Sequence, residues 1–217
     1  MKVEYKLYNP NKNFTALVAG EFSKDEKFNI AKKIFEKEPT CEQVGFVSVK
    51  GKVAVLEMAG GEFCGNATMC AAMMTGLKKV KCSGNDEILN VDVNEDICTL
   101  SCIILPTGIN HKVFLEKFDK TVAEEAIKKE TKPTGYMYLD GNVLTPLVFI
   151  PEINTLFWEN ACASGVIAVG DYLYKSTGED VDLDLMLPGG TMNIKVSDEG
   201  FKLTEKIVLD KDGFVEW

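Results

Sequence analysis

The chain has 217 residues, of which 46% are hydrophobic and 26% charged, which is typical of one or two globular domains with a sizeable core. Its formal net charge of −9, with no offsetting basic run, disfavours binding to nucleic acid or to anionic lipid. Lysine supplies all 24 positive charges and arginine is absent, so no guanidinium group can bind a carboxylate or a phosphate. No apolar run is long enough to span a membrane.

Seven cysteines, an odd number, and a first segment without a signal-peptide type of apolar run predict a cytoplasmic protein with free thiols. Cys98 and Cys102 are four residues apart in a strand-like run, which separates them by roughly 13 Å. No Cys-x-x-Cys motif occurs. We therefore expect no metal site.

The predicted elements mix strands and helices along the whole chain. Alternating and β-rich runs predict strands at 14–20, 45–58, 96–105, 112–118, 136–150 and 182–187. Helices are predicted at 24–37 with Ser23 as N-cap, at 66–76 ending at Gly76, at 122–130 and at 164–176.

An internal repeat relates the two halves of the chain. Each half contains a cysteine (Cys64, Cys162), a helix of small residues, a strand, a Leu-Pro-x-Gly step (105–108, 187–190) and a further strand. Two copies of one pattern predict two α+β lobes related by a pseudo-twofold axis. Such an axis would bring the two cysteines face to face across a cleft.

Cys64 and Cys162 each directly precede a predicted helix start. The unpaired amides and the dipole of a helix N-terminus favour a thiolate there and can lower a thiol pKa from about 8.5 into the neutral range. The alternative for any single cysteine is burial as a packing residue, and this is our interpretation of the other five, including Cys70 in the first small-residue helix.

Two opposed thiols can invert a carbon centre: one thiolate removes a proton and the other thiol returns a proton from the opposite face. Racemisation of an amino acid is such a reaction. The two helix starts also offer main-chain amides that can bind the substrate carboxylate and stabilise the enolate without arginine. These amides belong to Gly65, Asn66, Ala67, Ala163, Ser164 and Gly165.

Two acids near the cysteine motifs and the lone histidine are further candidates for a functional role. Glu159 has two equally supported interpretations: an acid that stabilises the helix start, or a ligand of the substrate ammonium. For Glu62 we favour the first, structural interpretation. The lone histidine, His111, is interpreted as a surface residue, because nothing acidic flanks it. Neither a dinucleotide-binding nor a phosphate-binding glycine motif occurs, and we expect no cofactor.

Several stretches of the chain resemble the diaminopimelate epimerase family. "GEFCGNATMC" and "NACASG" resemble the two catalytic motifs of these enzymes, "NKNFTALV" resembles their opening motif, and 184–215 resembles their closing strands. The likeness follows the order of most of the chain.

The resemblance implies two pseudo-symmetric lobes, each a mixed or antiparallel sheet wrapped around a central helix, and cofactor-independent two-base catalysis. It implies that Cys64 and Cys162 are the acid/base pair. The expected substrate-binding residues are Asn13, Gly65, Asn66, Glu159, Asn160, Ala163, Ser164 and Gly165. We expect a first lobe of 1–117, completed by the strand at 206–217, and a second lobe of 118–205.

The chain departs from that family where the epimerases hold the distal end of diaminopimelate. The Glu-Arg pair before the second cysteine is replaced by "FWEN", and the segment 136–158 is short. We therefore expect not a true diaminopimelate epimerase but a racemase of a single free amino acid, with histidine preferred and Trp158 contributing to a different side-chain pocket. The alternatives are diaminopimelate epimerase proper and a non-catalytic paralogue that binds a small carboxylate. A monomer or a homodimer would fit.

Overall fold

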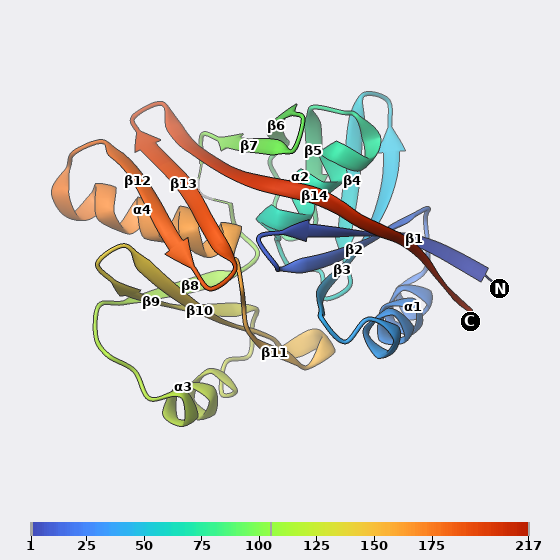
Figure 1. Ribbon diagram of the computed structural model, residues 1–217, viewed down its shortest axis with the longest axis horizontal. Helices are drawn as coiled ribbons and strands as arrows, with labels where there is room; N and C mark the ends of the chain where they lie inside the picture. The colour runs from blue at the N-terminus through green and yellow to red at the C-terminus, as the bar shows by residue number, and fades with distance from the viewer. Residues whose placement is uncertain (1, 105, 217) are drawn as a thin grey trace.

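Two helices form the centres of two lobes in the computed structural model, which describes residues 2–104 and 106–216. They are α2 (Gly65–Thr75) and α4 (Ala163–Thr177), and each is surrounded by strands of one continuous sheet (Figure 1). The fold is therefore the sheet-rich α+β fold with two lobes that the sequence predicts.

The first lobe is a closed ring of strands around α2. Its strand order is β1-β2-β3-β4-β5-β6-β7-β14, and the pairing of β14 with β1 closes the ring. The bounds are β1 (Lys2–Pro10), β2 (Phe14–Ala19), β3 (Cys41–Lys50), β4 (Val53–Met58), β5 (Lys79–Cys82), β6 (Leu89–Asn94), β7 (Ile97–Cys102) and β14 (Gly200–Glu216). Because the ring encloses it on all sides, α2 is apolar almost throughout and buried along most of its length.

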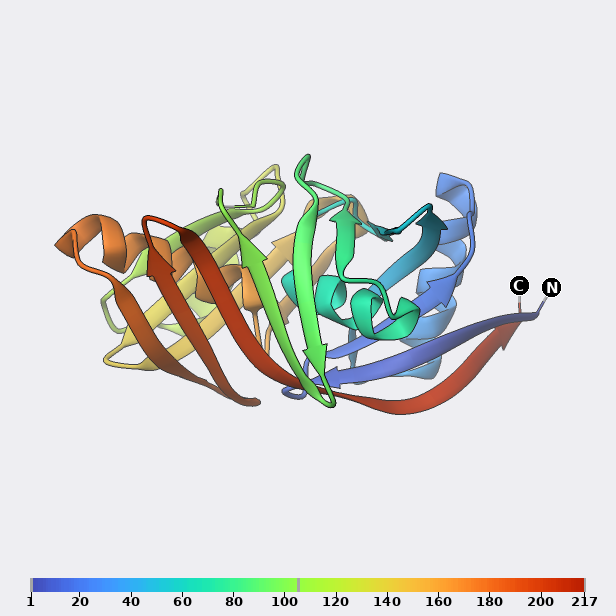
Figure 2. The ribbon, with the colours of Figure 1, turned by 90° about the horizontal axis from the view of Figure 1, so that it is seen from above.

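The second lobe surrounds α4 with the strand order β14-β13-β12-β10-β9-β8, and β11 pairs with β10. The bounds are β8 (Asn110–Phe114), β9 (Thr134–Asp140), β10 (Val143–Ile150), β11 (Thr155–Trp158), β12 (Val181–Leu187) and β13 (Gly190–Ser197), with a short 3-10 turn η1 (Pro151–Ile153) before β11. The long strand β14 pairs with β13 and β7 through its first half and with β1 through its second half, and so runs along both lobes (Figure 2).

Two amphipathic helices cover the outer faces of the sheet. Helix α1 (Lys24–Lys37) buries Ile30 and Ile34 in an apolar cluster with β1, β2 and β3, and α3 (Lys120–Ile127) buries Ile127 against β9 and β10. These clusters are separate from the main core, which joins α2 and α4 to the inner faces of the strands.

Local signals fix the helix boundaries close to their predicted positions. Ser23 and Glu26 form a capping box at the start of α1, and Gly76 and Gly178 end α2 and α4 in left-handed backbone conformation. The strand runs predicted at 45–58 and 136–150 are each a hairpin that turns at a glycine with positive φ, Gly51 or Gly141.

Strand β8 lies on the N-terminal side of the expected lobe boundary at residue 117. β8 pairs with β9 and contacts α4, so this strand lies in the second lobe although it precedes the expected boundary at 117. The predicted Leu-Pro-x-Gly step of the first half begins at Leu105, which lies outside the described residues. The equivalent step at 187–190 forms the turn between β12 and β13.

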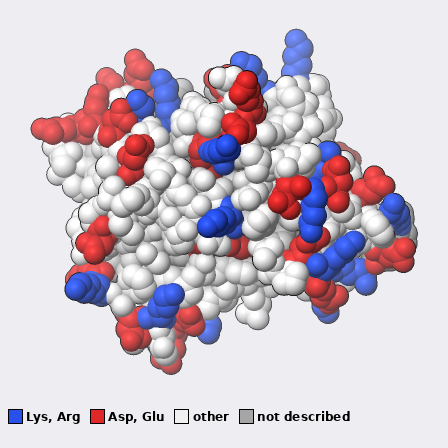
Figure 3. Space-filling model, in the orientation of Figure 1, with Lys and Arg blue, Asp and Glu red and all other residues white. Residues whose placement is uncertain are grey.

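Charges lie mostly at the periphery of the face in Figure 3, and much of its middle is uncharged. Acidic residues gather where α4 leads into β12, at Glu179, Asp180, Asp182 and Asp184. Within the ranges 2–104 and 106–216, no helix has the length and apolar character needed to cross a membrane.

Candidate active site

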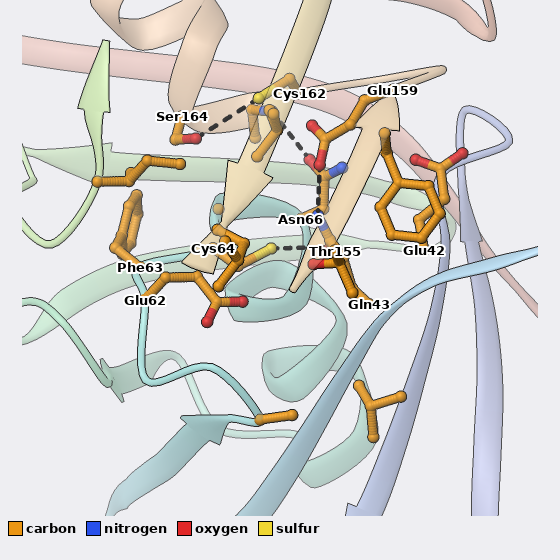
Figure 4. A pocket seen from close by; sticks show the side chains of 18 of the residues that line it. Glu42, Gln43, Glu62, Phe63, Cys64, Asn66, Thr155, Glu159, Cys162 and Ser164 are labelled. Atoms are coloured by element: carbon orange, nitrogen blue, oxygen red, sulfur yellow. Dashed lines mark hydrogen bonds between the residues drawn. The ribbon is translucent and has the colours of Figure 1, made fainter. Parts of the chain in front are cut away.

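The two cysteines that open the repeated helices lie at one pocket (Figure 4). Cys64 is the N-cap of α2 and Cys162 the N-cap of α4, and both have extended backbone angles. Their exposed fractions are 6% and 4%. The fold thus brings together two thiols that are ninety-eight positions apart in sequence, each at the positive end of its own helix.

The two helix starts touch each other. A Cβ added to Gly65 would lie 2.7 Å from the Cβ of Ala163, so only glycine allows this approach. The side chain of Asn66 bridges the contact: its Nδ2 donates to the Ala161 carbonyl at 3.1 Å, and its Oδ1 accepts from the Ala163 amide at 3.1 Å. Asn66 therefore holds the second helix start against the first.

The amides of the first helical turns have several different roles. The Ala67 amide donates to Cys64 Sγ at 3.3 Å, and a hydrogen bond from the Gly165 amide acts to lower the pKa of Cys162. Because the Ala163 amide donates to Asn66, the first-turn amides for which the described residues provide no acceptor belong to Gly65, Asn66 and Ser164.

Both thiols are protonated in the pocket as it stands. Burial raises the pKa of Cys64 and of Cys162 well above the ordinary range, and the amide hydrogen bonds oppose this only in part. Nearby Glu159 also raises the pKa of Cys162. A thiolate is therefore favoured when water or a positive charge reaches the thiol, or when a neighbouring negative charge is neutralised.

Three carboxyl groups line the same pocket, and two of them, Glu62 and Glu159, are buried. Glu62 precedes α2, Glu159 lies between β11 and α4, and Glu42 is on β3. Burial raises the pKa of Glu62 to about 7 and raises the pKa of Glu42, and burial together with repulsion by Glu42 raises the pKa of Glu159. One oxygen of Glu62 and one of Glu159, each called Oε2, has no hydrogen-bond partner among the described residues. Glu62 is therefore more than an acid near a helix start, because its side chain also lines the pocket.

Gln43, which the sequence did not single out, connects the two sides of the pocket. Its Oε1 accepts from Cys64 Sγ at 2.9 Å, and its Nε2 donates to Glu159 Oε1 at 3.2 Å. Thr15 Oγ1 also donates to Gln43 Oε1 at 3.2 Å. Gln43 thereby fixes the orientation of Cys64 and of the Glu159 carboxyl group together.

Two expected substrate-binding residues act through Glu42. Asn13 Nδ2 donates to one Glu42 oxygen at 2.7 Å, and Asn160 Nδ2 donates to the other at 2.8 Å. Neither asparagine lines the pocket, so they position the carboxyl group that does. Gly165 also lies outside the pocket lining, where a Cβ would meet Met137 Sδ at 2.2 Å and Cys162 Sγ at 3.2 Å.

The interpretation of His111 as a surface residue holds only in part, because one edge of the ring reaches a side chain of the thiol pocket. The imidazole is half-buried on β8, and its Nε2 lies 3.2 Å from Ser164 Oγ. Ser164 lines the thiol pocket, and its Oγ lies 3.6 Å from Cys162 Sγ. Nothing near position 111 in sequence indicates this contact, because it depends on how β8 packs beside α4.

The expectation that Trp158 shapes the side-chain pocket is wrong. Trp158 stacks on Phe118, and its Nε1 donates to Glu124 on α3 at 2.7 Å, so the indole points away from the thiols. The neighbouring Phe157 lines the pocket instead, as expected from the alternation of side chains along a strand. The other apolar lining residues are Phe35, Val44, Ala59, Phe63, Ile109, Val148, Ile150 and Ile153.

The pocket encloses about 30 Å³, which is room for one or two water molecules. Its polar lining offers carboxyl groups and amides, with no lysine and no imidazole among the described lining residues. Over the part of the chain that the structure describes, no group of three or more histidine, cysteine or acidic side chains is placed to bind a metal.

The sequence matches known racemases across most of its length. A family model described as the N-terminal domain of the histidine racemase CntK matches residues 2–106 and again residues 98–212, so the same model fits both halves of the predicted repeat. A histidine racemase of Staphylococcus aureus (strain Mu50) is 29% identical, over 88% of this chain and 87% of that protein.

Solved structures share the fold at much lower sequence identity. A protein of the PhzF family of phenazine biosynthesis from Enterococcus faecalis superposes with a TM-score of 0.66 at 15% identity, with all of both chains covered. A probable proline racemase of Agrobacterium radiobacter K84 gives a TM-score of 0.65 at 8% identity over 99% of this chain and 93% of the other. These likenesses confirm the two-lobed fold that the resemblance implies.

Proposed function

The chain belongs to the histidine racemase family and is an amino acid racemase, and from that premise we propose that it inverts the α-carbon of free histidine between the Cys64 and Cys162 thiols without a cofactor. The observation that carries this proposal is the meeting of two N-cap thiols at one buried pocket, on helices whose first turns touch.

In the proposed reaction, one sulfur acts as a thiolate and removes the α-proton, while the other, as a thiol, donates a proton to the opposite face. The bond to one hydrogen breaks as the bond to the other forms, so the configuration inverts and each cysteine ends in the protonation state its partner had. Two chemically similar groups suit a reaction whose two ends are nearly equal in energy.

The negative charge that develops on the substrate needs donors fixed in place. We assign the α-carboxylate to the free amides at the start of α2 and α4, those of Gly65, Asn66 and Ser164. Two helix N-termini directed at one carboxylate can bind it without arginine, which this chain lacks. Removing one such donor typically costs about 3 kcal/mol of transition-state stabilisation.

The carboxyl groups of the pocket can bind the positively charged groups of the substrate. We assign the α-ammonium to the unpartnered oxygen of Glu159, with Glu62 and Glu42 facing the substrate side chain. A cationic group there would compensate the negative charge that raises the pKa of Cys162, and so would help one thiol to ionise.

The same carboxyl groups favour histidine over diaminopimelate. The three acids of the lining would repel the second carboxylate of diaminopimelate, and no basic side chain is present in the described lining to offset them. An imidazole ring fits both the acids and the apolar wall around Phe157. Since the pocket encloses only about 30 Å³, it must open for the substrate to enter.

A panel of L-amino acids incubated with the protein in D₂O tests this proposal, with deuterium at the α-carbon measured by mass spectrometry and configuration by chiral chromatography. We expect D-histidine carrying one α-deuterium and no comparable product from lysine, arginine or diaminopimelate. Exchange confined to another amino acid would overturn the substrate assignment. Ligand binding without any α-exchange would support the non-catalytic alternative.

A further inference from the structure

A short chain of side chains leads from one catalytic thiol toward the surface. Cys162 Sγ lies 3.6 Å from Ser164 Oγ, and the same hydroxyl lies 3.2 Å from His111 Nε2. Ser164 lines the thiol pocket, whereas His111 lines a separate surface hollow of about 530 Å³ that also includes Thr107 and Lys175. Ser164 thus connects a residue of the thiol pocket, Cys162, with a residue of the surface hollow, His111.

The backbone holds the imidazole in this place. His111 on β8 pairs in register with Gly135 on β9, and a Cβ at Gly135 would lie 2.8 Å from His111 Cδ2. The missing side chain of Gly135 therefore leaves the space that the ring occupies beside α4. Burial lowers the pKa of His111 to about 4, so the ring is neutral at physiological pH and can accept a proton on one nitrogen while the other carries one.

The second thiol is arranged differently. Cys64 Sγ donates to the side-chain oxygen of Gln43 and accepts from the Ala67 amide. Amides do not take up or release protons near neutral pH, so these two contacts orient the Cys64 thiol but do not carry its proton away. Among the described residues, only Cys162 is linked through hydrogen bonds to an imidazole.

We propose that Ser164 and His111 form a proton relay that returns Cys162 to its starting protonation state between turnovers. This inference rests on the proposed two-thiol function. Each inversion leaves the two thiols with exchanged protonation states, so the free enzyme must exchange protons with solvent before it can turn over again in the same direction.

The relay carries one proton between Cys162 and water, and the opposite change at Cys64 occurs by exchange with water in the pocket. The Cys162 thiol gives its proton to Ser164 Oγ as the serine hydroxyl proton passes to His111 Nε2, and the imidazolium releases its Nδ1 proton to water. Proton exchange with water then returns the ring to the tautomer with a free Nε2 before the next turnover. The reverse sequence delivers a proton from water to the Cys162 thiolate. His111 acts here as a positioning and relay residue that does not contact the substrate.

Steady-state kinetics of His111→Gln separate a relay from a purely structural role. Slower recovery of the free enzyme lowers kcat but leaves kcat/KM unchanged, because kcat/KM reports only the steps up to inversion. We expect kcat to fall at least about tenfold, kcat/KM to stay within about twofold of the wild type, and the α-deuterium isotope effect on kcat, but not on kcat/KM, to shrink toward unity. Lys112→Gln, at the next and exposed position, should leave all three values unchanged.

Several outcomes would overturn the relay. If kcat and kcat/KM fall together in a His111→Gln protein that melts at the wild-type temperature, the histidine only orients Ser164 for substrate binding. Unchanged kinetics would show that Cys162 exchanges protons by another route. His111→Asn provides the same test should the glutamine variant fail to fold. A wild-type chain without turnover on any amino acid would instead overturn the proposed function, independently of these variants.

Discussion

Gly65 and Ala163 are in contact across the junction of the two lobes, where a methyl group on Gly65 would lie 2.7 Å from the Ala163 Cβ. Ordinary carbon contacts are about 3.5–4 Å, so Gly65→Ala must push the two helix starts, and with them the thiols, apart. We expect kcat/KM to fall on the order of a hundredfold. The double variant Gly65→Ala/Ala163→Gly removes the colliding methyl group and should recover much of the loss. Full activity in Gly65→Ala alone would mean that the spacing of the helix starts does not matter.

The unpartnered oxygen of Glu159 provides a test of ammonium recognition. Glu159→Gln keeps the shape of the side chain and its contact with Gln43 but removes the negative charge. Because charged hydrogen bonds contribute about 1.5–3 kcal/mol, KM for histidine should rise at least about tenfold. Glu152→Gln, an exposed acid in the preceding turn, is the control and should behave as wild type. An unchanged KM in Glu159→Gln would assign the ammonium to another group.

The bridge made by Asn66 should contribute to stability as well as to catalysis. Asn66→Asp keeps an acceptor for the Ala163 amide but replaces the donor to the Ala161 carbonyl with a second oxygen, at a site that is 1% exposed. We expect the free energy of unfolding, measured in urea, to fall by about 1–3 kcal/mol. The exposed Asn90→Asp serves as the control, and equal effects of the two substitutions would count against the bridge.

Glu205 predicts a pH dependence of stability outside the active site. This residue on β14 is 2% exposed, its Oε1 has no partner among the described residues, and burial raises its pKa from 4.5 to about 8. Between these two values the native state holds a proton that the unfolded state has released, so stability falls as pH rises from about 4.5 to about 8.

Glu205→Gln should therefore remove part of that fall, on the order of a few kcal/mol. The measurement is urea unfolding at a series of pH values, with the exposed Glu199→Gln as the matched variant. If the wild type and Glu205→Gln lose the same stability between pH 5 and pH 8, the carboxyl group is ionised or solvated in the native state.

Local sequence signals were sufficient for the helices. The capping box of Ser23 and Glu26, and the left-handed glycine at position 76, act within a few residues of the boundaries that they set. The repeated cysteine motifs likewise placed both thiols at helix starts, because the N-cap position is a local property. Local signals could not predict that β14 closes the first ring, because this closure pairs strands some two hundred residues apart. The expectation of a completing strand at 206–217 came from the family resemblance.

The missed parts of the candidate site depend on strand phase and long-range packing. Gln43 lies on a strand about twenty residues before Cys64, and only the folded sheet brings its amide to the thiol. A shift of one residue along β11 exchanges Phe157 for Trp158 at the pocket, and the sequence does not fix that phase. His111 has no local motif at all, because its partner is on α4.

Single-cysteine variants assayed with L-histidine in D₂O test the two-thiol account most directly, with Cys70→Ala, a buried residue of α2 away from the pocket lining, as the folded control. The account predicts that the wild type and Cys70→Ala form D-histidine with one α-deuterium, whereas Cys64→Ala and Cys162→Ala each form none. Formation of deuterated D-histidine at the wild-type rate by either single variant would contradict it.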